Sequence, residues 1–159
     1  MADLKPLRIV DLSLLALVFV GVGWAAGHLY YEDLPSVPTL VGVPLLVLAA
    51  IEAVAGVFIR RRIAGGEVGS GLHDLDPLVI ARTVVLAKAS AIVGAVFAGG
   101  WLGLLAHLIQ QYDRLTAARS DTPGTALGVV AGVLLVVAAV WLERACAVPP
   151  EQRDDGSRQ

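Results

Sequence analysis

The segment DPLVIARTVVLAKASAIVGAVFAGGWLGLLAHLIQQYDR, residues 76–114, is the longest apolar stretch of the chain. It is long enough to cross a bilayer, because a membrane-spanning helix needs about 20 predominantly apolar residues. Lys88 lies well inside it, at a depth where a charged side chain is costly unless another polar group compensates it. The other apolar stretches are therefore interpreted by how they could pack around Lys88.

The composition is typical of a membrane protein. Of the 159 residues, 57% are hydrophobic and only 16% are charged, whereas soluble domains carry about 25% charged residues. The apolar residues fall into four blocks, so we predict an all-α fold: an integral membrane bundle of four transmembrane helices. The predicted spans are about residues 9–30, 38–59, 78–107 and 123–142. They form one domain, residues 1–147, and the polar tail, residues 148–159, is predicted to be disordered.

Local signals predict where the spans begin. Asp76 before Pro77, and Thr122 before Pro123, each resemble a capping residue followed by proline at the first helical position. Pro44 is expected about two turns inside span two, where it would kink the helix. Span one follows a basic lead, as in a signal peptide, but its apolar run is longer and no clear cleavage pattern follows it. We therefore expect span one to remain in the membrane.

Basic residues are distributed unevenly between the two sides of the predicted bundle. One side collects both terminal segments and the loop after span two, with Lys5, Arg8, Arg60, Arg61, Arg62, Arg144, Arg153 and Arg158. The opposite side holds Arg114 and Arg119. Because basic loops stay in the cytoplasm, we predict that both termini and the tail are cytoplasmic and that Arg60, Arg61 and Arg62 form a cytoplasmic anchor.

Small residues recur at intervals of four along three of the spans. Helices in lipid associate through such residues, because small side chains let two backbones approach closely. The predicted packing residues are Gly23, Gly27, Ala91, Ala95, Gly99, Gly103, Gly124, Gly128 and Gly132. They could hold the four helices of this chain together, or leave one stripe for a partner protein.

The intramembrane charges form a predicted polar cluster. Lys88 lies within about 20° of Ala95 and Gly99 on a helix, so it points into a packed face. Glu52 lies roughly 12 Å inside Arg60, similar to the depth of Lys88, and we predict that Glu52 and Lys88 form an ion pair. The full predicted cluster is Asp11, Glu52, Arg82, Lys88, Glu143 and Arg144. It could fix helix register, or bind a headgroup, an ion or a partner's charge.

No motif in the chain indicates catalysis. The glycine-rich loop between spans two and three lacks the phosphate-binding pattern GxxxxGK[ST]. His28 and His107 lie on different spans without a third metal ligand nearby, and Cys146 is the single cysteine. We therefore predict no catalytic residues, no metal site and no cofactor. The net charge of −2 does not suggest nucleic acid as a partner.

Several of these residues together resemble a known family. The pattern comprises Glu52, Arg82, Leu86-Ala87-Lys88-Ala89, Gly94, Gly99-Gly100, Leu142-Glu143-Arg144 and Cys146. Over roughly Ile9 to Pro149 the chain resembles an actinobacterial family of small four-span membrane proteins, the domain of unknown function 3180. The resemblance implies a multi-pass protein of the bacterial inner (plasma) membrane, and it implies no activity. One cysteine stands where the family pattern ends in a Cys-rich or Cys-Arg sequence, so no role passes to Cys146.

Three functions are compatible with the sequence. The first is a non-enzymatic scaffold or accessory subunit, with membrane lipid and either a membrane-protein partner or a second copy as its partners. Short loops and abundant small-residue stripes favour it. The second is a small transporter or lipid-binding subunit that uses Glu52 and Lys88. The third is an enzyme that acts on lipid-linked substrates through Arg60–Arg62 and Arg82.

Overall fold

The computed structural model describes residues 9–30, 38, 40–64 and 77–146, and these form helices and no strand. The helices are α1 (Ile9–Tyr30), α2 (Val43–Ala64), α3 (Pro77–Gln111) and α4 (Thr116–Ala145). All four are long and apolar enough to cross a membrane. The predicted all-α, four-helix membrane bundle is therefore confirmed. The predicted C-terminal tail and Asp76, the predicted cap of span three, lie outside the described residues.

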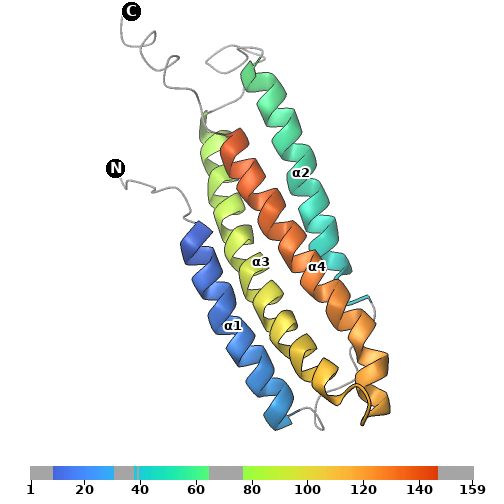
Figure 1. Ribbon diagram of the computed structural model, residues 1–159. Helices are drawn as coiled ribbons and strands as arrows, with labels where there is room; N and C mark the ends of the chain where they lie inside the picture. The colour runs from blue at the N-terminus through green and yellow to red at the C-terminus, as the bar shows by residue number, and fades with distance from the viewer. Residues whose placement is uncertain (1–8, 31–37, 39, 65–76, 147–159) are drawn as a thin grey trace, which may run out of the picture.

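The four helices run alternately up and down, side by side, in the spatial order α1, α3, α4, α2 (Figure 1). The inner helices α3 and α4 pack against each other along much of their length. On the outer sides, α1 packs on α3 and α2 packs on α4. Each edge helix therefore has one main neighbour, and α1 buries only Leu12 and Gly27 completely. The end of the bundle that contains Ile9, Ala64 and Ala145 is called the Arg144 end below.

Small side chains make the contacts between helices. Ala87, Ala91 and Ala95 of α3 are fully buried, and Ala131, Ala138 and Ala139 of α4 are buried as well. Most large apolar side chains of α1 and α2 point outward. This arrangement suits a lipid environment, because helices there gain little from apolar contact alone and associate by close packing.

Pro44 does not kink α2, contrary to the prediction. The helix begins at Val43 and not at residue 38, so Pro44 lies in its first turn. The amide groups of a first turn have no partner inside the helix, so proline costs no hydrogen bond there. At its other end α2 continues through Arg60, Arg61 and Arg62, which were predicted to close the span.

The start of α4 was also predicted wrongly. The helix begins at Thr116, and Pro123 lies inside it. The turn before it is stabilised by Arg119, whose Nε donates to the Tyr112 carbonyl at 2.9 Å and whose guanidinium lies 3.6 Å from the Asp113 carboxylate. These local contacts let the helix start earlier than the Thr-Pro signal indicated.

Candidate functional site

Lys88 is paired with a helix other than the predicted one. Its Nζ lies 3.7 Å from Oε1 of Glu143 on α4, and the two side chains are 18% and 15% exposed. The predicted Glu52–Lys88 ion pair is not among the ion pairs found between described residues. The packing of the helices favours Glu143: α3 packs along much of α4, whereas α2 has α4 as its main neighbour and meets α3 near the Arg144 end. The estimated depth in the membrane suggested Glu52 as the partner of Lys88. The packing of α3 against α4 instead places Glu143 next to Lys88.

Glu52 is instead buried as a separate polar group. It is 1% exposed, on the face of α2 that also buries Ala49, Gly56 and Ile59. Ser90 of α3 is the polar side chain next to its carboxyl group. Neither carboxyl oxygen has a hydrogen-bond partner of good geometry among the described residues. A buried polar group without a hydrogen-bond partner lowers the stability of the fold by about 1–3 kcal/mol.

We expect Glu52→Leu to raise the free energy of unfolding by about 1–3 kcal/mol, because leucine removes the unsatisfied carboxyl group and fills a similar volume. Glu52→Gln is the matched control, since its amide keeps a polar group in the same place and should give a smaller gain. Denaturant titration in detergent micelles measures both. A loss of stability in the leucine variant would show that the carboxyl group has a stabilising partner.

Two of the six residues of the predicted polar cluster, Lys88 and Glu143, form an ion pair. Asp11, Arg82 and Arg144 are exposed, and none of them has an ion pair with another described residue. What the structure brings together is the Lys88–Glu143 pair, with Glu52 beside Ser90 as a second position.

Two arginines of the predicted anchor, Arg60 and Arg62, contact different aromatic rings. Arg60 lies over the Trp141 ring at 5.2 Å, and Arg62 lies over Phe58 at 4.8 Å.

The small-residue stripes lie at two interfaces within the chain. Gly99 and Gly103 face the backbone of α1, and Gly132 faces the backbone of α3 at Ala98. Of the nine predicted packing residues, Gly23 is half-buried and the following are buried: Gly27, Ala91, Ala95, Gly99, Gly103, Gly124, Gly128 and Gly132. These stripes are therefore used within the chain, one along α1 and α3 and one along α3 and α4.

A histidine contact was missed by the sequence reasoning. The rings of His28 and His107 meet edge to face with centroids 6.0 Å apart, and Trp24 stacks on His28 at 5.4 Å. His107 also packs over Gly27. The signal was present, because His107 continues the stripe of α3 by one more interval of four, opposite the small residues of α1. Among the described residues, no three His, Cys, Asp or Glu side chains gather as a metal site would require.

Cys146 belongs to the packed interior at the Arg144 end. It is buried with Ile59, Ala87 and Leu142. Burial raises the pKa of its thiol, and a protonated thiol is a poor nucleophile. The contact explains a cysteine at this position as a small apolar side chain.

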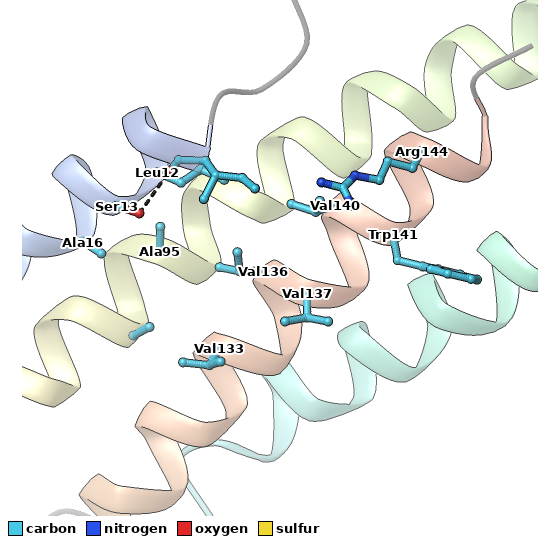
Figure 2. A pocket seen from close by; sticks show the side chains of 12 residues that line it. Leu12, Ser13, Ala16, Ala95, Val133, Val136, Val137, Val140, Trp141 and Arg144 are labelled. Atoms are coloured by element: carbon cyan, nitrogen blue, oxygen red, sulfur yellow. Dashed lines mark hydrogen bonds between the residues drawn. The ribbon is translucent and has the colours of Figure 1, made fainter.

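Two grooves flank α4 on its exposed side, and the sequence predicted neither. The α1–α4 groove has a volume of about 470 Å³ and is drawn in Figure 2. Its lining is Ile9, Leu12, Ser13, Ala16, Ala95, Ala98, Val133, Val136, Val137, Val140, Trp141 and Arg144. The α2–α4 groove has a volume of about 520 Å³. Its lining is Leu46, Ala49, Ala50, Ala53, Val57, Leu134, Val137, Ala138 and Trp141. Arg144 is the one charged residue in these two linings.

Comparison with known proteins gives one family. Residues 12–150 match the sequence model of a family described as "Protein of unknown function (DUF3180)". Neither the curated proteins nor the solved structures give a match. The matched range includes all of α2, α3 and α4 and nearly all of α1.

Proposed function

Because the chain belongs to a family described as of unknown function (DUF3180), its function rests on its own geometry, and we propose a non-enzymatic scaffold or accessory subunit. It would dock to a larger membrane assembly. The proposal includes a location in the bacterial plasma membrane with both termini in the cytoplasm. The uneven distribution of basic residues supports that orientation.

The α2–α4 groove is the observation that carries the proposal. Its floor contains Ala49, Ala53 and Ala138, and Ala50 lies exposed at its side. Small residues let a neighbouring helix approach the backbone closely, which is how helices recognise one another in lipid. The internal stripes are already occupied, so this alanine surface is available to a helix from outside the chain.

The dimensions of the groove suit one helix. Along α2 it extends from Leu46 to Val57, about three turns or roughly 16 Å. No charged residue lines it, so the docking segment should be an apolar transmembrane helix. A membrane protein of the assembly or a second copy of this chain could supply such a helix.

We expect a photo-crosslinking residue at Ala50 to join the protein to another polypeptide in native membranes, giving one discrete product of higher mass. Ile51 is the matched control, because it is adjacent, 60% exposed and about 100° further around α2. Crosslinking from Ile51 should give lipid adducts only. The Ala50 product should disappear when Ala53→Trp fills the groove. Equal products from both positions, or lipid adducts alone from Ala50, would contradict the proposal.

The buried Glu52 favours one alternative, a small transporter. Intramembrane carboxyl groups mark proton and ion pathways in many membrane proteins. The original form of this alternative required a Glu52–Lys88 site, but Lys88 pairs with Glu143. Transport would therefore have to depend on Glu52. In proteoliposomes, a transporter should carry protons or cations at a rate that falls in Glu52→Gln, whereas a scaffold should show no flux that depends on Glu52.

A further inference from the structure

The α1–α4 groove is lined by a charged residue, Arg144, whereas the α2–α4 groove is lined by uncharged residues only. We propose that it binds an anionic phospholipid, with one acyl chain in the groove and the phosphate on Arg144. This inference concerns a lipid site and does not depend on the scaffold role.

The shape of the groove fits an acyl chain. Its volume of about 470 Å³ lies within the usual range of ligand sites, about 300–1,000 Å³. The side chains of Ala16, Ala95 and Ala98 are small, so they leave room for a ligand in the groove. Valines of α4 line one side of it (Figure 2). Along α4 the lining runs from Val133 to Arg144, which is roughly 16 Å of helix. One leaflet of a bilayer has a hydrocarbon depth of about 15 Å, so the groove matches one acyl chain in length.

The charge lies at the end where a headgroup would be. Arg144 is in the last turn of α4 and is exposed. In Figure 2 its side chain extends over Val140 toward Leu12 of α1, across the end of the groove. The nearby Trp141 is a residue type enriched at the membrane interface. An arginine here can hold a phosphate through two parallel hydrogen bonds.

Among the described acidic residues, none forms an ion pair with Arg144. Glu143 is engaged with Lys88. Ile9 and Ser13 of α1 line the groove, but Asp11 does not. Around the helix axis, Asp11 lies about 200° from both of them. Arg144 has no ion pair with any described residue. An apolar groove that ends in an arginine with no ion pair to a described residue is complementary to an amphiphile with an anionic head.

Lipid retention by the purified protein tests the site. The protein is delipidated in mild detergent, mixed with phosphatidylglycerol or phosphatidylcholine of identical acyl chains, and examined by native mass spectrometry. We expect one phosphatidylglycerol per chain, retained about tenfold more strongly than phosphatidylcholine. Arg144→Gln should abolish the preference, and Arg144→Lys should keep part of it. Val133→Trp, at an exposed position of the lining, should abolish retention of both lipids.

Two matched controls separate the groove from the general surface. Arg82→Gln removes an exposed arginine of α3 that is outside the groove, and Val130→Trp enlarges an exposed side chain of α4 one turn before it. Both should retain phosphatidylglycerol as the parent does. Equal retention of the two lipids by the parent overturns the proposal. It is likewise overturned if Arg144→Gln keeps the preference, or if the groove is filled by a helix of a second copy and the protein is a lipid-free dimer.

Discussion

Replacing Gly99 with alanine is expected to detach α1 from α3 and to lower the free energy of unfolding by about 1–3 kcal/mol. A Cβ atom at residue 99 would meet the carbonyl oxygen of Ala16 and would lie 3.0 Å from Cβ of Phe19. The Ala16 oxygen belongs to the helix backbone and cannot rotate away, so the two helices would have to separate. Loss of this contact should be large, because α3 is the main neighbour of α1.

The adjacent glycine provides the control for this effect. A Cβ atom at Gly100 would meet nothing within 4 Å. Gly100→Ala should therefore leave stability unchanged or raise it by up to about 1 kcal/mol, because alanine is the better helix former. Denaturant titration in micelles, followed by tryptophan fluorescence, measures both variants. Equal effects of the two substitutions would show that α1 and α3 do not approach at Gly99.

The second large effect is expected at the Lys88–Glu143 pair. Lys88→Met should destabilise the protein by about 3–5 kcal/mol, because it leaves the Glu143 carboxylate without its ammonium partner in a mostly buried position. The double variant Lys88→Met, Glu143→Leu should recover most of the loss, since replacing a buried pair by apolar residues is often neutral or stabilising. The two single variants and the double variant form a cycle that isolates the pair.

Glu52 is the control partner for this cycle. If the sequence-based pairing of Glu52 with Lys88 were correct, Glu52→Leu would rescue Lys88→Met. The structure predicts additive effects, so that Glu52→Leu gives the same gain in the Lys88→Met background as in the parent protein and no additional rescue. A strong coupling between Glu52 and Lys88, with none between Glu143 and Lys88, would contradict the observed helix arrangement.

The helices and their lengths follow from local properties of the chain. A run of about 20 apolar residues has to form a helix in lipid, because only internal hydrogen bonds can satisfy its backbone. The existence of all four spans was therefore predictable. The ends of the helices were less predictable. Pro44 lies in the first turn of α2 and not two turns inside it, and Pro123 lies inside α4 and not at its start. A proline next to a possible cap indicates a helix start, but contacts such as those of Arg119 decide whether the helix begins earlier.

The candidate sites were only partly predictable. Residue types and spacing marked Lys88, Glu143 and Glu52 as intramembrane polar groups, and they marked the small-residue stripes. Pairing depends on which helices are neighbours, and all four spans have similar hydropathy, so hydropathy does not reveal the order of the helices. Depth in the membrane could therefore not distinguish Glu52 from Glu143 as the partner of Lys88.

The sequence by itself determined a four-span membrane protein with charges that must be buried or paired, because transfer of charge into hydrocarbon is unfavourable wherever it occurs. Only the tertiary structure decided the order α1, α3, α4, α2, and with it the Lys88–Glu143 pair and the separate burial of Glu52. The same order created the two grooves beside α4, and Arg144 lines only one of them. Grooves and ion pairs form between helices distant in sequence, and their geometry depends on close packing of backbones that no single helix specifies.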